Sequence, residues 1–421
     1  MQRLKIEGGR RLSGELSVQG AKNSVLPILS ACVLVNDEVK LKGCPSLSDV
    51  YAAMRILGDT GCKCEKYENE ILVNSRMLDK TEVSEALMRR MRSSIIFMGA
   101  LLGRTGECTL TFPGGCELGP RPIDLHLSAL RQMGTHITEE HGALICRCPD
   151  GLKGSFINLS FPSVGATENI MLAAAAADGE TIICNAAREP EICDLAEFLG
   201  ACGADIRGAG SPRIIIKGVD KSSLHGCEYA VMPDRIAAVT YLCMAAVTGG
   251  EIALNGARGS DIEAVINVLR LAGCEIYDCD GRLYLTARRR LKAVRTVRTQ
   301  PYPGFPTDAQ AIVMACLTKS EGTGIFVEDI FENRFRHVDE LVRMGADIKT
   351  EGRVAVVSGV KRLSGASVVA PDLRGGAALC VAAAAAEGET LISNVNLIDR
   401  GYDAIEKAMS GLGARASRVN C

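Results

Sequence analysis

The chain has 421 residues, which is too long for one ordinary hydrophobic core and predicts two domains of roughly 200 residues each. Its 47% hydrophobic and 23% charged residues, with no Trp, are typical of a soluble α/β enzyme and exclude a fibrous or disordered chain. The 48 Lys plus Arg are balanced by 50 Asp plus Glu, so the chain has no net positive charge that would attract a nucleic acid or an anionic membrane. Any anionic ligand must therefore be bound by a local group of basic residues.

The N-terminal residues 1–11 lack the apolar run of a signal peptide, and no stretch of 18 consecutive apolar residues occurs anywhere, so we expect a cytoplasmic protein. Eighteen cysteines are spread along the chain, and we expect most of them to be reduced and buried. There is no C-x-x-C pair, which makes a zinc site an unfavoured interpretation.

A recurring sequence phrase (a pattern in which an apolar helix ends at a glycine and a short strand of alternating apolar and polar residues follows) appears six times along the chain. The glycines are Gly61, Gly134, Gly203, Gly273, Gly345 and Gly413. Subtracting successive positions gives spacings of 73, 69, 70, 72 and 68 residues, close to one sixth of the chain. The sequence therefore predicts six related units, three in each domain.

Each predicted unit also contains a strand opened by Gly-Glu or a near equivalent, preceded in most units by an Ala-rich helix. The strands begin near Glu38, Glu107, Glu180, Glu251, Thr323 and Glu389. Helices such as those ending at 173–177 and 382–386 are apolar nearly all round, so we expect them to lie buried inside their domain. A period near 70 residues with buried helices favours closed, pseudo-symmetric domains over a solenoid.

Short polar turns precede the predicted buried helices. In chain order they carry Lys22-Asn23, Arg92, Ser163-Val164-Gly165, Asp234-Arg235, Thr307-Asp308 and Asp372-Leu373-Arg374. Helix N-termini present free N–H groups and a partial positive charge, which suits the binding of phosphate and carboxylate groups. The alternative is that these residues simply cap their helices.

A glycine-rich loop follows the second predicted Gly-Glu strand, from Pro113 to His126. Its glycines permit a mobile loop, and Pro122 and Asp124 suit the first turn of the next helix. Cys116 lies at the predicted tip, where a nearby cation such as Arg121 could make the thiol more acidic and reactive. The alternative is that Cys116 is one more small hydrophobic residue among eighteen cysteines.

Other catalytic signatures are absent from the sequence, including G-x-x-x-x-G-K-[ST], H-E-x-x-H and G-x-S-x-G. Only five histidines occur, none paired at a metal-binding spacing, and we interpret His126 and His337 as helix residues. The sequence therefore predicts no metal and no cofactor.

Seven phrases carry a resemblance that runs from Lys5 to about Val419. They span residues 20–23, 113–126, 163–167, 185–191, 305–308, 331–335 and 399–402. Together they resemble the UDP-N-acetylglucosamine 1-carboxyvinyltransferases, a family of enolpyruvyl transferases. The resemblance implies a two-domain inside-out α/β barrel of six repeats with the helices inside and a substrate cleft between the domains. It places one domain at 22–232 and the second at 1–21 plus 233–421.

The same resemblance implies the reaction: the enolpyruvyl group of phosphoenolpyruvate moves to the 3′-hydroxyl of UDP-N-acetylglucosamine with release of phosphate, the first committed step of peptidoglycan synthesis. Lys22, Arg92, Arg121 and Arg400 would surround phosphate and carboxylate groups, and Asp308 would act as general base. Cys116 would be the acid that protonates C3 or assists phosphate release, and it would form a covalent adduct with phosphoenolpyruvate. A small phosphonate epoxide is expected to alkylate Cys116. The implied walls for nucleotide and sugar are Asn23, Arg121, Pro122, Ile123, Asp124, Leu125, Ser163, Val164, Gly165, Ile330, Arg334, Asp372, Leu373 and Arg374.

One departure from the family pattern stands before Ser163, where many relatives carry a Lys and this chain has Phe161-Pro162. A contact to the diphosphate is therefore lost or supplied elsewhere. Two other functions stay open at this point: a shikimate-type enolpyruvyl transferase, and a non-catalytic paralogue that binds UDP-sugar. The presence of Cys116, Asp308 and Arg400 disfavours the second.

Overall fold

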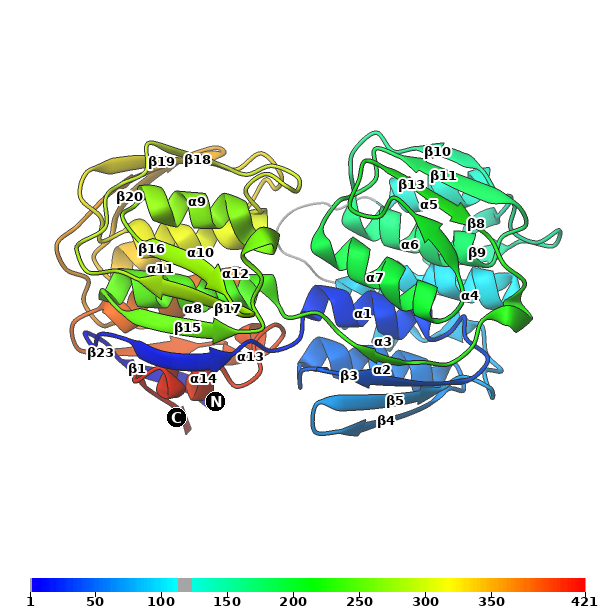
Figure 1. The fold of residues 1–421 in the computed structure, drawn as a ribbon, viewed down its shortest axis with the longest axis horizontal. Coiled ribbons are helices and arrows are strands. Elements are labelled where there is room, and N and C mark those ends of the chain that lie inside the picture. Colours follow the sequence, from blue (N-terminus) through cyan, green and yellow to red (C-terminus); the bar gives the residue numbers. More distant parts are fainter. Residues whose placement is uncertain (1, 113–122, 421) are drawn as a thin grey trace. The chain divides into compact units, whose positions relative to one another are not determined.

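The computed structural model describes residues 2–112 and 123–420, which form two compact units. Unit 1 contains residues 2–19 and 233–420, and unit 2 contains residues 20–112 and 123–232. Each unit has its own hydrophobic core: that of unit 1 includes Leu4 and Ile6 together with residues between Ile236 and Leu412, and that of unit 2 runs from Val25 to Val231. In Figure 1 the blue N-terminal strand β1 (Gln2–Glu7) lies among the red and orange C-terminal elements.

Unit 2 contains three four-stranded sheets within the described residues, with orders β14-β3-β5-β4, β6-β7-β9-β8 and β10-β11-β13-β12. The strands are β3 (Glu38–Lys42), β4 (Lys63–Tyr67), β5 (Glu70–Asn74), β6 (Glu82–Val83), β7 (Glu107–Thr111), β8 (His136–Glu140), β9 (Ala143–Arg147), β10 (Phe156–Asn158), β11 (Glu180–Cys184), β12 (Asp205–Arg207), β13 (Arg213–Lys217) and β14 (Glu228–Ala230). In every sheet one edge pair is parallel and the other pairs are antiparallel. The last strand of unit 2, β14, completes its first sheet.

Unit 1 repeats this pattern, with described sheets in the orders β16-β17-β15-β2, β18-β19-β21-β20 and β22-β23-β1-β24. Its further strands are β2 (Ser13–Ser17), β15 (Glu251–Asn255), β16 (Glu275–Cys279), β17 (Arg282–Thr286), β18 (Thr296–Arg298), β19 (Thr323–Val327), β20 (Asp347–Glu351), β21 (Val354–Ser358), β22 (Ser367–Val369), β23 (Glu389–Ser393) and β24 (Arg415–Asn420). Strand β1 lies between β23 and β24, with Leu4 opposite Ile392 and Gln2 opposite Asn420. The first strand of the chain thus completes the last repeat.

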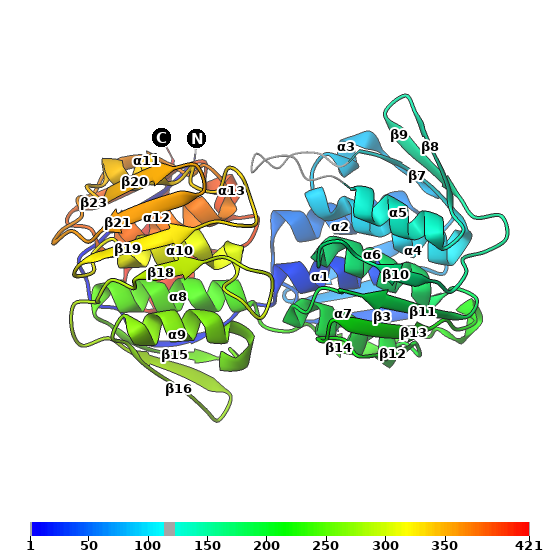
Figure 2. The same ribbon diagram turned by 90° about the horizontal axis from the view of Figure 1, so that it is seen from above.

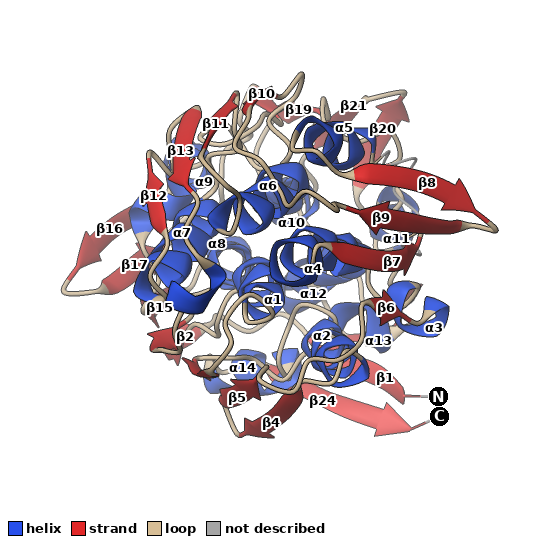
Figure 3. Cartoon of the chain, turned by 90° about the vertical axis from the view of Figure 1, so that its right-hand side faces the viewer, coloured by secondary structure: helices blue, strands red, loops and turns tan. Residues whose placement is uncertain are grey.

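The Ala-rich helices form the inside of each unit. In unit 2 they are α1 (Lys22–Ala31), α4 (Phe97–Thr105) and α6 (Val164–Ala175), and in unit 1 they are α8 (Arg235–Thr248), α10 (Thr307–Leu317) and α12 (Leu373–Ala385). Nearly all of their residues are buried, as the apolar composition predicts. Figure 3 shows α1, α4 and α6 in the middle with strands around the outside, and Figure 2 shows α10 and α12 among the strands β18, β19 and β21. Small residues permit this packing: a Cβ on Gly99 of α4 would lie 2.2 Å from the Asn169 carbonyl oxygen of α6.

Amphipathic helices lie outside this inner layer. The longer ones are α2 (Ser48–Asp59), α5 (Asp124–Gln132), α7 (Pro190–Ala201), α9 (Glu263–Leu271), α11 (Val338–Arg343) and α14 (Ile405–Gly411), and the short helices are α3 (Glu85–Met88), α13 (Val395–Ile398), η1 (Arg92–Ile96), η2 (Lys221–Ser223) and η3 (Gly259–Ile262). The six glycines of the recurring phrase follow the ends of α2, α5, α7, α9, α11 and α14, all with φ between +87° and +104°. This left-handed conformation explains why glycine marks the repeat.

The predicted six repeats with helices inside are confirmed, but the expected barrel needs a correction. Within the described residues each sheet keeps its own two edge strands, so no strand joins one sheet to the next and no closed barrel forms. Most of the described cysteines are buried free thiols, as expected. No described helix combines the length and the apolar character needed to cross a membrane.

Candidate active site

A carboxylate paired with two arginines lies in unit 1: that of Asp308, the second residue of α10. Its Oδ1 lies 3.0 Å from Nη2 of Arg334, and its Oδ2 lies 2.9 Å from Nη2 of Arg374. Arg334 and Arg374 are both buried, whereas the Asp308 side chain is 29% exposed. Arg334 also donates to the carbonyl oxygen of Thr307, 3.0 Å away, so it binds the helix start as well as the carboxylate.

These arginines determine the protonation state of Asp308. Burial acts to raise the pKa of Asp308, but the charges of Arg374 and Arg334 outweigh it and hold this pKa well below its ordinary value. In return, burial acts to lower the pKa of Arg374, and the charge of Asp308 raises it above its ordinary value. Asp308 is therefore ionised at neutral pH. The alternative reading of Asp308 as a helix cap is wrong, because Pro306 holds the N-cap position of α10.

Residues at the starts of α8 and α12 also act on the Asp308 carboxylate. Asp234 caps α8 by accepting from the amides of Ile236 and Ala237, both at 2.9 Å, and the charge of the next residue, Arg235, also lowers the pKa of Asp308. Asp372 caps α12 in the same way, accepting from the amides of Arg374 and Gly375 at 2.9 and 3.0 Å. Asp234 and Asp372 are thus caps, and Leu373, half-buried, is the first residue of α12.

Two further segments of unit 1 carry predicted substrate residues. Ile330 lies in the bend after β19, with its amide 3.0 Å from Oε1 of Glu328. Arg400 lies in the turn after α13, half-buried. Gln19 holds this turn through both ends of its amide: Nε2 donates to the carbonyl of Gly401 at 3.0 Å, and Oε1 accepts from the amide of Asp403 at 2.8 Å.

A buried imidazole, that of His337, lies beside the start of α12. A Cβ on Gly375 would lie 3.1 Å from the Cβ of His337. Burial lowers the pKa of His337 to about 4, although the charge of Asp372 acts in the opposite direction. His337 is the residue at the N-cap position of α11, and it is neutral at physiological pH.

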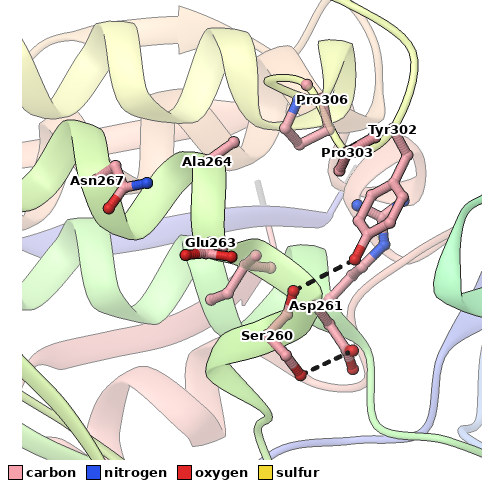
Figure 4. Close-up of a pocket in the computed structure, with 11 residues that line it drawn as sticks. Ser260, Asp261, Glu263, Ala264, Asn267, Tyr302, Pro303 and Pro306 are labelled. Atoms are coloured by element: carbon pink, nitrogen blue, oxygen red, sulfur yellow. Dashed lines mark hydrogen bonds between the residues drawn. The ribbon is translucent and has the colours of Figure 1, made fainter.

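A cavity of about 290 Å³ opens next to the start of α8 and α10. One wall is the loop before α10, with Tyr302, Pro303 and Pro306, and the opposite wall is formed by residues 260–264. Figure 4 shows the Tyr302 side chain reaching across to residue 260, where its hydroxyl donates to the Ser260 carbonyl oxygen at 3.3 Å. The ring of Tyr302 also lies over Arg235, with 5.7 Å between the guanidinium carbon and the ring centroid.

In unit 2, Lys22 is the first residue of α1 and Asn23 the second. The ammonium of Lys22 lies 2.7 Å from Oδ2 of Asp49, and both side chains are largely buried, with 12% and 4% exposed. Asp49, in the first turn of α2, fixes where this positive charge stands.

The start of α6 and the start of α5 come together in unit 2. Ser163 caps α6, its hydroxyl accepting from the amide of Ala166 at 3.4 Å, and Val164 and Gly165 follow. A Cβ on Gly165 would lie 3.2 Å from Cε1 of His126, which belongs to α5. Nδ2 of Asn169 in α6 lies 2.9 Å from Nδ1 of His126. The nearby predicted residues are Ile123, Asp124 and Leu125, of which Ile123 is buried and Asp124 exposed.

Three predicted site residues, Cys116, Arg121 and Pro122, lie outside the described residues, and Arg92 begins the short helix η1. Phe161, which stands where the family resemblance predicts a Lys, is 45% exposed. Sequence reasoning missed Asp49, Gln19, Asn169 and Glu328 as partners of predicted site residues. Asp49, Gln19 and Asn169 make these contacts across 27 or more positions of the chain, whereas Glu328 lies only two positions before Ile330, and no motif of theirs gives a signal on its own.

Comparison with known proteins agrees with this arrangement. A family model described as EPSP synthase (3-phosphoshikimate 1-carboxyvinyltransferase) matches residues 6–409. The crystal structure of the enolpyruvyl transferase NikO from Streptomyces tendae superposes with a TM-score of 0.89 at 22% identity, covering 100% of this chain and 99% of that chain. The fold is therefore that of the enolpyruvyl transferases.

Curated relatives are much more similar in sequence. UDP-N-acetylglucosamine 1-carboxyvinyltransferase 2 of Caldanaerobacter subterraneus subsp. tengcongensis is 49% identical over 419 residues, covering 100% of both chains. The UDP-N-acetylglucosamine 1-carboxyvinyltransferase of Nitratidesulfovibrio vulgaris strain Hildenborough is 48% identical over 421 residues, covering 99% of both. The chain belongs to the enolpyruvyl transferase family, among the UDP-N-acetylglucosamine 1-carboxyvinyltransferases.

Proposed function

We propose that this chain transfers the enolpyruvyl group of phosphoenolpyruvate to the 3′-hydroxyl of UDP-N-acetylglucosamine, releasing phosphate in the first committed step of peptidoglycan synthesis. The observation that carries the proposal is identity of 45–49% over essentially the whole length of relatives named for this reaction. The enzyme is thus a transferase. Its placement in the cytoplasm and the division into domains at 22–232 and at 1–21 plus 233–421 remain predictions.

The reaction brings two anionic molecules together, and cationic side chains reduce their repulsion. The proposed groups are Lys22, Arg92 and Arg121 of residues 20–232, and Arg400 of unit 1. The oxygen of the sugar hydroxyl bonds to C2 of phosphoenolpyruvate while a proton adds to C3. The C2–O bond to phosphate then breaks and C3 loses a proton, which restores the double bond and releases phosphate.

Asp308 is the proposed acceptor of the sugar hydroxyl proton, a role worth about 10² to 10⁴ in rate. A carboxylate held by two guanidinium groups binds a proton weakly, so part of this stabilisation must be lost when the ligands bind. Cys116 is the proposed acid that protonates C3, and Arg334, Ile330 and the start of α12 are proposed to contact the sugar and nucleotide.

The proposed function is tested by phosphate release from phosphoenolpyruvate with UDP-N-acetylglucosamine, with shikimate 3-phosphate, and with no acceptor. We expect release with the UDP-sugar only. Release with shikimate 3-phosphate alone would assign the chain to the enzyme type for which the family model is named. Binding of the UDP-sugar without release would indicate the non-catalytic regulator.

The role of Cys116 has its own test. A small phosphonate epoxide that mimics phosphoenolpyruvate should alkylate Cys116 alone among the 18 cysteines, and faster when UDP-N-acetylglucosamine is present. Peptide mass mapping measures the label, and Cys116→Ser provides the control. Label spread over several cysteines, or absent from position 116, would remove Cys116 from the proposed chemistry.

A further inference from the structure

Glu328, directly after β19, holds a buried carboxylate whose partners are all neutral donors. Its side chain is 1% exposed. Oε1 accepts hydrogen bonds from the Thr299 hydroxyl and from the amides of Ile330 and Phe331, each at 3.0 Å. The hydroxyl of Thr307 lies 3.1 Å from Oε1 and 3.0 Å from Oε2. One carboxylate therefore joins three separate stretches of backbone.

These three stretches all lead to the Asp308 centre. Thr299 and Thr307 stand at the two ends of the loop 300–306, which forms one wall of the cavity in Figure 4. Thr307 is also the first residue of α10, and Asp308 follows it. The bend at Ile330 and Phe331 leads to Arg334, whose guanidinium contacts both the Thr307 carbonyl and the Asp308 carboxylate. The contacts form a closed ring. Glu328 binds Thr307, the Thr307 carbonyl binds Arg334, and the bend at residues 330–331 connects Arg334 back to Glu328.

We propose that Glu328 is a positioning residue for the reaction, which fixes the start of α10 relative to the bend at residues 330–331. It acts through Thr307 and through the two amides, without touching substrate. The proposal rests on the proposed function, because it assigns Glu328 the task of keeping Asp308, Ile330 and Arg334 in one geometry. Misplacement of reacting groups by about 1 Å can cost about 100-fold in rate.

The geometry predicts different results for two substitutions of the same residue. Glu328→Gln keeps Oε1 as acceptor for Thr299, Ile330 and Phe331, and its new amide group can donate to the Thr307 hydroxyl. Glu328→Ala leaves buried donors without their acceptor, so the loop, the helix start and the bend lose their common anchor. Geometry, more than negative charge, should therefore decide activity.

The test measures kcat and KM for both variants and for Thr318→Ala, a matched control. Thr318 is a buried hydroxyl at the other end of the same helix, donating to the Ala315 carbonyl at 2.7 Å. We expect Glu328→Ala to lower kcat about 10- to 100-fold. Glu328→Gln and Thr318→Ala should stay within about threefold of the parent kcat. Equal losses for Glu328→Gln and Glu328→Ala, or a kcat for Glu328→Ala within about threefold of the parent, would overturn the proposal.

Hydrogen exchange of the Ile330 and Phe331 amides provides a readout that does not depend on turnover. Glu328→Ala should expose both amides to faster exchange, and Thr318→Ala should not. If Glu328→Ala does not fold, Thr307→Val removes only the link to α10 and should lower kcat about fivefold with the bend still protected. If the parent chain shows no turnover, the proposed function fails, whereas unchanged exchange at 330–331 in Glu328→Ala or unchanged kcat in Thr307→Val overturns the role of Glu328.

Discussion

The two units have the same scaffold but use it differently. In unit 1, the starts of α10 and α12 and the segment before α11 bring a carboxylate and arginines into direct contact, with Asp308 bound to both Arg334 and Arg374. In unit 2, the starts of α1 and α6 carry one ion pair, Lys22 with Asp49, and a serine cap, Ser163. Equivalent positions of a repeated fold thus supply a tightly paired charge cluster in one unit and separate polar groups in the other. The repeat determines where side chains stand, and their identity determines the chemistry.

The largest effect is expected from removing the charge of Asp308, which lies between Arg334 and Arg374 in unit 1. We expect Asp308→Asn to bind both substrates but to turn over at least about 100-fold more slowly. It should also lower the unfolding temperature, since the amide leaves two buried guanidinium groups uncompensated. Steady-state kinetics and calorimetry measure the two effects.

Asp234→Asn is the matched control for that variant, because Asp234 is a buried carboxylate that caps α8 and asparagine caps helices equally well. Its kcat should stay within about threefold of the parent. Normal turnover in Asp308→Asn would exclude Asp308 as the base. Because the pKa of Asp308 is depressed in the ligand-free protein, we also expect no loss of kcat/KM from its protonation between pH 7 and 5.

The two buried histidines, His126 and His337, differ in their surroundings, and for His337 this predicts a pH-dependent folding stability. His126 in unit 2 has a hydrogen bond to Asn169, whereas burial lowers the pKa of His337 in unit 1 to about 4. The unfolded chain binds a proton at His337 near pH 6.5 and the folded chain only near pH 4, so folding stability falls as the pH drops through this range. The loss should approach about 3 kcal/mol.

Urea unfolding followed by circular dichroism at pH 7, 6, 5 and 4.5 measures this effect. His337→Gln cannot be protonated, so its stability, although lower at pH 7, should decline less steeply than that of the parent chain. The contribution of Asp308 is lost mainly below its ordinary pKa of 3.8, so only a small part of it falls in this window. Parallel pH curves for the two proteins would contradict the assignment to His337.

A smaller effect is expected from the Lys22–Asp49 ion pair of unit 2. Asp49→Asn removes the partner that orients the Lys22 ammonium, and we expect the KM for phosphoenolpyruvate to rise about tenfold with little change in kcat. Glu65→Gln breaks the exposed pair with Lys63 in the same unit and should change neither constant. An unchanged KM in Asp49→Asn would show that Lys22 is positioned without Asp49.

The smallest effect concerns Phe161, the position at which the family resemblance predicts a lysine. Phe161→Lys adds a cation two residues before the cap of α6, and we expect the KM for UDP-N-acetylglucosamine to fall about threefold at low salt and less at high salt. Phe156→Lys, at another exposed phenylalanine of the same unit, is the control. If both substitutions lower the KM equally, a general field explains the effect and a local contact does not.

Much of the fold follows from the sequence because its signals are local. The repeating glycines need a left-handed backbone, and the Ala-rich segments have no polar face to turn toward water, so six repeats and buried helices could both be predicted. The separate sheets could not, because strand pairing across repeats depends on edges that a single repeat does not reveal.

The candidate site was harder to predict for a related reason. The sequence shows that Thr307 and Asp308 open a helix, but the partners of Asp308 stand 26 and 66 positions further on, at Arg334 and Arg374. The packing of α10 against α12 brings Arg374 to Asp308, and the segment before α11 brings Arg334 there. Glu328 was also hard to predict, because it lies in no recognisable motif although it binds Thr299 and Thr307 at the two ends of the loop 300–306.

The position of β1 also has a consequence for synthesis on the ribosome. Residues 2–7 are made first, yet both of their strand neighbours, β23 and β24, are made last. Residues 20–232 form a continuous stretch with a core of their own, so we expect unit 2 to fold while the rest is still being translated. Strand β1 therefore has no strand to pair with until β23 and β24, and so nearly the whole chain, have been synthesised.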